Sequence, residues 1–542
     1  MNRRNSQFLK IFLYMLVLNF FFLCIYFVFH SSSSPEPQSH FPVGRFHVTA
    51  SNQSIQKPWP ILPSYLPWTP PPRDVRVGSC EGYFGNGFTR RVDFLRPRIS
   101  GGVSDRSWFR CFYSATLRSS ICEGGNLRMV PDRIVMSKGG ERLEEVMGRR
   151  EEEELPQFQE GAFEVAEERS RPGFKSRRDG GGGGNPRRLV NDEMLNAYIP
   201  GGDIERHTMR DLMASIRAVD LEDFACEEWV EEPTLLVTRF EYANLFHTMT
   251  DWYSAYVSSR VTGLPTRPHV VFLDGHCSTQ LEETWMALFS GIRYAKNFTN
   301  PVCFRHVILS PLGYETTLFK GLHEDINCEG VSSHDLWQNP DDTKTARLSE
   351  FGEMIRSAFE FQVNRQKPQP PPHHSILFVR REDYLAHPRH RGKVESRLSN
   401  EEEVFEAIQR WIGSGSGSTG LKCGMNLVNG LFGHMTMREQ VRAIQEASVI
   451  VGAHGAGLTH VVSATSKAVV FEIVSSSFRR PHFRLIAKWK GIEYRAMNLV
   501  GSYADPKEVV EKMKEVVGKV KHIELEIDFL VVQWIFYFFF FA

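Results

Sequence analysis

The sequence predicts an α/β protein made of two lobes, and three observations lead to this prediction. Segments with strand and helix character alternate from Thr234 to Leu309 and again from Ser375 to Val517. The proline-rich tract Arg365–His374 separates the two series and is typical of a linker. The second series contains a glycine-rich turn between two apolar strands. Such alternation predicts helices packed on parallel sheets, and two such lobes leave a cleft between them for a ligand.

The expected elements follow from β-branched apolar runs and from helix-compatible stretches. In the first series we expect strands at 234–238, 270–274 and 306–309 and helices at 241–260 and 281–289. In the second we expect strands at 375–379, 424–428, 449–451, 468–473 and 492–497 and helices at 401–412, 435–447 and 506–517. These elements place an N-terminal lobe at 76–364, with a flexible Gly- and Arg-rich loop at 169–188, and a C-terminal lobe at 375–520.

Two further segments of the N-terminal lobe carry expectations. The stretch from Cys80 to Val130 is rich in aromatic residues, cysteines and turn signals, so we expect an ordered, loop-rich region stapled by disulfides. The stretch from Glu141 to Glu168 is acidic and helix-prone, and we expect a solvated helical face there.

The N-terminus has the features of a membrane anchor. Residues 11–29 are almost wholly apolar, which is long enough to span a bilayer. Arg3, Arg4 and Lys10 precede this segment and place residues 1–10 in the cytosol by the positive-inside rule. A cleaved signal peptide is the alternative, but its apolar core would be shorter. We therefore expect a type II anchor followed by a Ser/Pro-rich stem at 30–75. The hydrophobic tail at 521–542 is atypical and is not expected to belong to the functional fold.

The charge balance and the cysteines bear on nucleic-acid binding, on structural zinc and on the compartment of the protein. Lys and Arg together number 64, as do Asp and Glu, so no net charge favours binding to nucleic acid. No C-x-x-C pair occurs among the 9 cysteines, which argues against a structural zinc site. Cys24 lies in the anchor, and the even number that remains is compatible with disulfides in an oxidising compartment. The sequons at Asn52 and Asn297 would then face the lumen and be able to carry glycans.

The glycine-rich turn is the strongest candidate for a ligand site. The strand at Val449–Val451 is followed by the order G-x-x-G-x-G from Gly452 to Gly457, which differs from the dinucleotide fingerprint. A strand, a glycine turn and a helix aim free backbone N–H groups at an anion. We expect a phosphate-bearing ligand, with a nucleotide-sugar as the leading candidate; ordinary packing between strand and helix is the alternative. The donor-binding residues proposed here are His454, Gly455, Ala456, Gly457, Leu458 and Thr459.

Charged residues at the ends of neighbouring strands extend this site. Arg380 and Arg381 directly follow the strand at 375–379, where arginines can bind phosphate bidentately. A surface network with the adjacent Glu382 and Asp383 is the alternative. Glu472 lies near the end of the strand at 468–473, and we expect it to accept hydrogen bonds from ribose hydroxyls.

A second polar group is expected on the helix of the first lobe. Asn244, His247 and Asp251 recur at helical spacing and share one face, with Glu241 just before them. A His and a carboxylate on one face suit acceptor-hydroxyl binding or general-base chemistry. A helix start capped by Asn244, with a satisfied histidine, is the alternative. Because no D-x-D pair has a convincing setting, we expect no metal site and no required cofactor.

Several long motifs together resemble one known family. They are Trp59–Trp68, Ser79–Phe88, Phe240–Thr248, Phe378–Leu385 and Gly452–His460. These residues are similar to those of glycosyltransferase family sixty-one, and within it to the plant β-1,2-xylosyltransferases that process N-glycans. The likeness extends from the anchor to about Val517, and the tail from Lys521 onward departs from the family pattern.

The resemblance implies a fold, a reaction and a place in the cell. It implies a GT-B-like architecture, with two Rossmann-like lobes around an interlobe cleft, in a single-pass type II membrane protein of the Golgi. It also implies inverting, metal-independent transfer of xylose from UDP-α-xylose to the core β-mannose of an N-glycan. Asp251 or His247 would be the base, and Glu241 and Asn244 would bind the acceptor. Two alternatives stay open: a family member that transfers GlcNAc or arabinose, and a non-catalytic, membrane-tethered glycan-binding protein.

Overall fold

The computed structural model describes residues 56–60, 75–84, 87–96, 106–167, 187–324, 326–338, 345–363, 374–382, 397–414 and 424–518, all within one unit, Ser54–Ala542. The predicted anchor, most of the stem, almost all of the loop at 169–188, the linker up to residue 373 and the tail at 521–542 lie outside the described residues. In the part of the chain that is described, no helix has the length and apolar character needed to cross a membrane.

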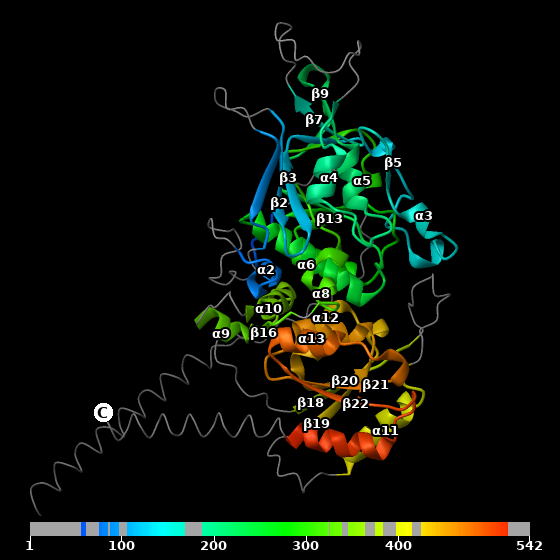
Figure 1. The fold of residues 1–542 in the computed structure, drawn as a ribbon. Helices are drawn as coiled ribbons and strands as arrows, with labels where there is room; N and C mark the ends of the chain where they lie inside the picture. Colours follow the sequence, from blue (N-terminus) through cyan, green and yellow to red (C-terminus); the bar gives the residue numbers. More distant parts are fainter. Residues whose placement is uncertain are drawn as a thin grey trace, which may run out of the picture. The chain divides into compact units, whose positions relative to one another are not determined.

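A mixed sheet of seven strands organises the N-terminal region (Figure 1). Its order is β1 (Arg90–Leu95), β2 (Trp108–Ser114), β3 (Ser119–Gly125), β15 (Val307–Leu309), β11 (Thr234–Val237), β12 (His269–Phe272) and β13 (Gly291–Tyr294). The four strands from β15 to β13 are parallel to one another and include all three predicted strands. The strands from β1 to β3 are antiparallel, and β3 pairs antiparallel with β15.

The prediction of a loop-rich region between Cys80 and Val130 is therefore wrong in part. The region is disulfide-bonded, as expected, but Cys111 and Cys122 lie on paired positions of β2 and β3 and join two regular strands. A second disulfide joins Cys80 of α2 (Cys80–Phe84) to Cys328. Half-buried and buried residues alternate along β2 from Trp108 to Phe112, and this period of two is typical of a strand.

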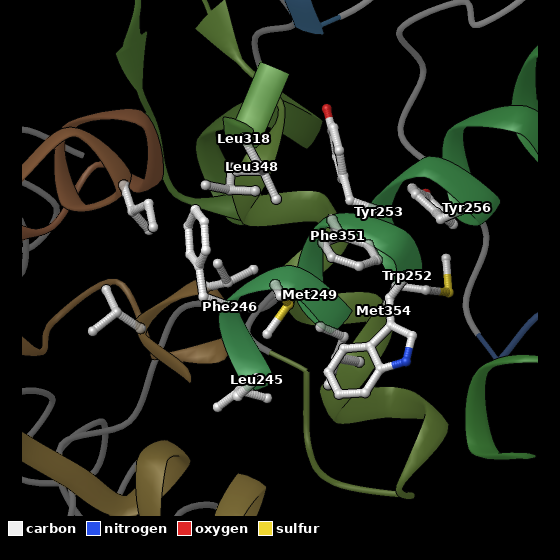
Figure 2. Close-up of a cluster of buried hydrophobic side chains, with 14 of the residues drawn as sticks. Leu245, Phe246, Met249, Trp252, Tyr253, Tyr256, Leu318, Leu348, Phe351 and Met354 are labelled. Carbon is white, nitrogen blue, oxygen red and sulfur yellow. The ribbon is translucent and has the colours of Figure 1, made fainter. Parts of the chain in front are cut away.

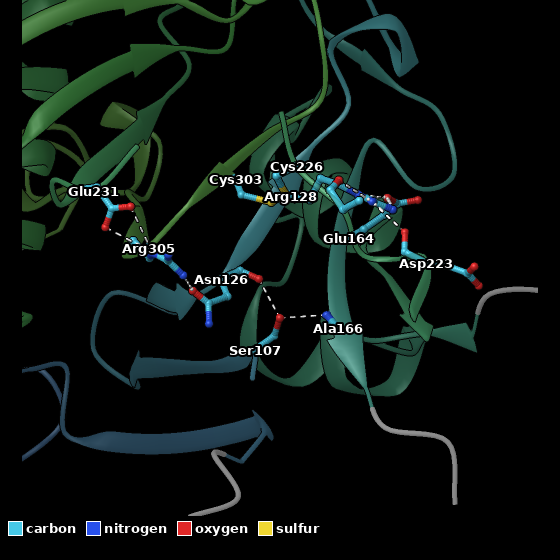
Figure 3. Close-up of a disulfide and its surroundings, with 11 residues drawn as sticks. Ser107, Asn126, Arg128, Glu164, Ala166, Asp223, Cys226, Glu231, Cys303 and Arg305 are labelled. Carbon is cyan, nitrogen blue, oxygen red and sulfur yellow. Dashed lines mark hydrogen bonds and ion pairs between the residues drawn. A yellow bond between two sulfur atoms is a disulfide. The ribbon is translucent and has the colours of Figure 1, made fainter. Parts of the chain in front are cut away.

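The N-terminal region also contains a second sheet, of six strands. Its order is β10 (Glu228–Val230), β14 (Val302–Phe304), β4 (Leu127–Met129), β7 (Phe163–Glu167), β9 (Arg217–Asp220) and β8 (Arg187–Arg188). A disulfide between Cys226 and Cys303 fixes its edge, and Arg128 forms an ion pair with Glu164 beside it (Figure 3).

The acidic stretch from Glu141 to Glu168 does not form the expected helical face. Only α3 (Glu151–Glu154) is α-helical there, and β7 occupies its end. Glu164 is buried in β7 because Arg128 and Arg133 neutralise its charge. A buried and paired carboxylate stabilises a strand that local composition alone disfavours.

The C-terminal region is a parallel sheet of five strands covered by helices on both faces (Figure 1). Its order is β19 (Met425–Gly430), β18 (His374–Val379), β20 (Ala447–Ala453), β21 (Val469–Val474) and β22 (Glu493–Asn498). All five predicted strands are thus present. The helix α11 (Glu401–Gly413) and the helix at 506–518 cover one face. The helices α12 (Met437–Glu446), η8 (Ala456–Ser463) and α13 (His482–Lys490) cover the other.

One hydrophobic core connects the two regions. It contains the inner face of the five-stranded sheet together with side chains from α6 (Leu245–Val261), α7 (Glu282–Leu288) and α10 (Leu348–Ala358). In Figure 2, Phe351 of α10 lies among Tyr253, Tyr256 and Met249 of α6. Two buried hydrogen bonds of 2.8 Å, from Arg356 of α10 to the carbonyls of Ser463 and Ala464, add a polar connection.

The shared core gives a stability prediction. Phe351 is fully buried against two tyrosine rings, so Phe351→Ala removes a large buried ring and should lower the free energy of unfolding by about 3–5 kcal/mol. Val500, which is 99% exposed, offers the matched control Val500→Ala, with an expected change below about 0.5 kcal/mol. Thermal unfolding of both purified variants measures the effect; equal melting temperatures would contradict the shared core.

Candidate active site

The five-stranded sheet has a topological switch point between β18 and β20. The chain passes from β18 outward to β19 and then back to β20 on the other side, which is the doubly wound order 2-1-3-4-5. In sheets of this kind ligands bind outside the carboxyl ends of the two strands that flank the switch point. Here those ends lead directly into Arg380 and Arg381 after β18 and into His454 and Gly455 after β20.

Arg381 lies directly over the glycine turn. Its Nη1 donates to the carbonyl of His454 at 3.4 Å. A Cβ placed on Gly455 would lie 2.0 Å from the same Nη1. Any residue with a side chain at 455 would therefore displace the guanidinium, and the close approach of Arg381 to the backbone explains the glycine.

Arg380 points elsewhere. Its guanidinium contacts Glu402 and lies 3.5 Å from Glu401, at the N-terminal end of α11. Arg380 thus belongs to an ion-pair network, as in the alternative interpretation, and its acidic partners Glu401 and Glu402 come from α11. The switch point brings only the second arginine of the pair to the glycine turn.

His454 is held by a buried carboxylate. Its Nδ1 lies 2.6 Å from Oε1 of Glu472, and the hydroxyl of Tyr494 donates to Oε2 of the same residue at 2.6 Å. Glu472 has no exposed surface, so this geometry favours orientation of His454 over direct contact with a ribose. A carboxylate that accepts from one ring nitrogen fixes the tautomer and the orientation of the ring. Tyr494 is a site residue that the sequence did not indicate.

The helix after the turn begins at Ala456 and is a 3-10 helix. Leu458 is fully buried in the shared core, so its contribution to a ligand site is confined to its backbone. Gly457 approaches Val379 of β18, which a Cβ would contact at 2.8 Å. The hydroxyl of Thr459 is buried and has no hydrogen-bond partner among the described residues.

The predicted acceptor residues gather at the start of α6. Asn244 caps the helix by accepting from the backbone N–H of Phe246 at 3.0 Å, and Glu241 lies one turn earlier. His247 is half-buried between the rings of Tyr314 and Phe319. Burial lowers the pKa of His247 to about 4, so the ring is neutral near pH 7. Its Nδ1 has no hydrogen-bond partner within the described chain.

Asp251 lies one turn further along α6 and is only 5% exposed. Burial, and to a lesser extent the neighbouring Asp274, raise the pKa of Asp251 well above its usual range. Gly313 passes so close that a Cβ there would lie 2.4 Å from the Asp251 carboxylate. A carboxyl that is closed to solvent cannot reach the hydroxyl of a substrate, so its position is poorly suited to a general base.

His482 connects the two groups of residues. It begins α13, and its ring lies 5.6 Å from that of His454 and 5.1 Å from that of Phe246, next to His247. Burial, together with His454 and other positive neighbours, lowers the pKa of His482 to about 4. No pattern in the sequence predicts this residue, because the residues that surround it in the fold are far away in the chain.

A buried ion pair lies behind α6. Arg239, which follows β11, binds Asp274 through its Nη2 at 2.8 Å, and Asp274 has no exposed surface. The arginine lowers the pKa of Asp274 and occupies its oxygens, so this carboxylate is not available as a metal ligand. Across the residues that are described, no group of three or more His, Cys, Asp or Glu is arranged to hold a metal ion.

Comparison with known proteins places the chain in a family. The family model of glycosyltransferase 61 matches residues 127–471, more than half of the chain. The chain belongs to the glycosyltransferase 61 family. It is 71% identical over 532 residues to the β-1,2-xylosyltransferase of Arabidopsis thaliana, covering 95% of this chain and 99% of that protein. The matched region includes α6, Arg381 and His454, and the site residues Glu472, His482 and Tyr494 follow it in the chain.

Two further relatives are informative. The β-1,2-xylosyltransferase of Oryza sativa subsp. japonica is 58% identical over 480 residues, covering 88% of this chain and 85% of that protein. The EGF domain-specific O-linked N-acetylglucosamine transferase of Gallus gallus is 23% identical over 287 residues, covering 51% of this chain and 46% of that protein. The relatives of this chain thus have different sugars in their names.

The buried neutral histidines predict how stability depends on pH. The pKa is about 3 for His460, whose Nε2 lies 2.7 Å from Oε1 of Gln440, and about 4 for His247 and His482. In the unfolded chain a histidine titrates near 6.5. As the pH falls from about 6.5 to about 4, the unfolded state binds more protons, so the free energy of unfolding decreases. We expect a lower melting temperature at pH 5 than at pH 7.

The variant His460→Gln tests this assignment. It removes the titrating ring and keeps a side chain able to bond Gln440, so the loss of stability per pH unit should become shallower, by up to about 1.4 kcal/mol. An unchanged slope in denaturant unfolding at several pH values would mean that His460 does not contribute.

Proposed function

We propose that this glycosyltransferase is a β-1,2-xylosyltransferase that moves xylose from UDP-α-xylose to the 2-hydroxyl of the core β-mannose of N-glycans. The observation that carries the proposal is the 71% identity, over 95% of the chain, to the Arabidopsis thaliana protein of that name. The geometry of the site supports a sugar-nucleotide donor but does not by itself select a pentose. By the resemblance, the acceptor carries a terminal GlcNAc on its α-1,3 arm.

We infer a GT-B-like arrangement in which the five-stranded sheet holds the donor and α6 faces the acceptor. Support comes from the doubly wound order of that sheet and from the parallel strands beside α6. His247 and His454 are linked through His482, so the two halves of the reaction meet there.

The donor diphosphate is proposed to lie at the switch point. Arg381 donates to the carbonyl of His454 there, and η8 begins at Ala456, directly after the turn. Charged and backbone donors aimed at a leaving phosphate stabilise the charge that develops on it. We propose that these groups make the transfer independent of a metal ion.

The reaction follows from this placement. The acceptor 2-hydroxyl attacks C1 of xylose from the side opposite to UDP, a C–O bond forms as the bond to the phosphate oxygen breaks, and the anomeric configuration inverts. The hydroxyl proton passes to His247, and UDP leaves with the electron pair. We assign the base to His247 because its ring is neutral and half-buried, whereas Asp251 is enclosed and burial raises its pKa.

We propose that the enzyme is a Golgi type II membrane protein with its catalytic region in the lumen. The apolar segment at 11–29 and the basic residues before it support the topology. Three disulfides support an oxidising compartment. Asn297 is exposed at the end of a short 3-10 helix, where a glycan can be attached.

Product analysis tests the proposal directly. The purified protein is incubated with a GlcNAc-terminated N-glycan and with UDP-xylose, UDP-GlcNAc or UDP-arabinose in separate reactions. We expect a β-1,2-linked xylose with UDP-xylose only, at the same rate with and without a chelator. Transfer of another sugar would support the other family members, and loss of activity with chelator would contradict metal independence. A folded protein that binds the glycan but neither UDP nor UDP-xylose would be the non-catalytic binding protein.

The two neighbouring arginines give a matched pair of variants. Arg381→Ala removes a charged hydrogen bond worth about 1.5–3 kcal/mol, so the Kd for UDP should rise more than tenfold. Arg380→Ala removes an ion pair with α11 and should leave the Kd within about threefold. Calorimetric titration with UDP measures both values, and equal effects would remove Arg381 from the donor site.

The base assignment is tested in the same way. His247→Gln should lower kcat by about 10²–10⁴, the usual contribution of a general base, with the Kd for UDP unchanged. Asp251→Asn replaces the enclosed carboxyl with an amide of the same shape, so we expect at least about a tenth of the kcat to remain. A loss confined to Asp251→Asn would reverse the two roles.

A further inference from the structure

A large cavity lies near the start of α6, where two of its lining residues, Tyr314 and Phe319, pack against His247. It measures about 1240 Å³. Its walls come from segments that are distant in the sequence: the turn at 115–118 between β2 and β3, the loop at 200–206, Phe240, and the segment at 314–324. The cavity is larger than the roughly 300–1,000 Å³ that small-molecule sites occupy.

The lining of the cavity suits an oligosaccharide. Phe240, Tyr314 and Phe319 present ring faces, on which the C–H faces of sugar rings can pack. Arg118, Asp203 and Glu205 are exposed on its rim and offer hydrogen bonds to hydroxyl groups. The same cavity therefore offers both aromatic packing and hydrogen bonds.

The aromatic wall borders the proposed base. The rings of Tyr314 and Phe319 lie 5.4 and 6.0 Å from the ring of His247. His323 also lines the cavity and is an electrostatic neighbour of His482. A chain of sugars in this cavity would therefore end next to His247 and His482.

We propose that this cavity binds the sugars of the N-glycan that extend beyond the reacting mannose. The proposal rests on the proposed function, since it takes His247 as the point where the acceptor hydroxyl reacts. It predicts that the cavity sets the affinity for the acceptor and leaves the affinity for the donor unchanged.

A cavity-filling variant tests the proposal. Gly201 lines the cavity, and a Cβ built on it meets no heavy atom within 4 Å, so Gly201→Trp adds bulk in open space. Gly501, outside the cavity lining, has the same open surroundings and provides the control Gly501→Trp. We expect Gly201→Trp to raise the KM for the N-glycan at least tenfold with an unchanged Kd for UDP, and Gly501→Trp to change neither. An unchanged acceptor KM in Gly201→Trp would overturn the proposal.

Two additional measurements keep the outcome interpretable. If Gly201→Trp does not fold, judged by its melting temperature, the variant Asp203→Ala/Glu205→Ala takes its place, with an expected rise in acceptor KM of about three- to tenfold. If the unmodified protein transfers no xylose, the proposed function fails, and direct calorimetric titration with the N-glycan still tests the cavity. Glycan binding that is lost in Gly201→Trp and kept in Gly501→Trp supports the cavity; equal binding in both contradicts it.

Discussion

The shared hydrophobic core between α6, α10, η8 and α13 is the constraint on which the site depends. His247 stands on the first turn of α6 and His454 directly precedes η8, so the packing of these helices sets the separation of the two residues. Arg356 strengthens this packing because it binds two carbonyls at the end of η8 in a buried position. A reaction that needs a base and a leaving group on opposite sides of one carbon requires such fixed spacing.

The donor side and the acceptor side of the site differ in their electrostatics. On the donor side, Arg381 supplies a charged hydrogen-bond donor for an anion, and Glu472 orients the ring of His454. On the acceptor side, burial lowers the pKa of His247 to about 4 and raises the pKa of Asp251, so burial disfavours the charged form of both side chains. Behind α6, Arg239 neutralises the charge of Asp274 in a buried ion pair.

Local patterns predicted much of the fold. The parallel strands, α6 and the glycine turn follow from β-branched runs, helical spacing and glycine punctuation, all of which act over a few residues. The antiparallel strands β2 and β3 were missed because their aromatic content resembled loop composition, and β7 was missed because the buried charge of Glu164 is balanced by Arg128 from another strand.

The site was predicted less completely, for a related reason. The sequence pattern predicted both arginines at the end of the strand but did not separate Arg381 from Arg380, since the position of α11 decides which guanidinium lies over the turn. It identified Glu472 but not its contact with His454, and it missed His482, because both depend on how distant strands and helices meet. Asn244 is a helix cap in the structure, as the alternative interpretation held.

The most direct test of the account is an experimental structure of the protein with UDP bound. The account predicts that the diphosphate lies at the carboxyl ends of β18 and β20, within hydrogen-bonding distance of Arg381 and of the backbone N–H groups at 455–457, while Arg380 keeps its contact with α11. UDP bound elsewhere, with Arg381 making no contact to phosphate, would contradict the assignment of the donor site and the reaction geometry built on it.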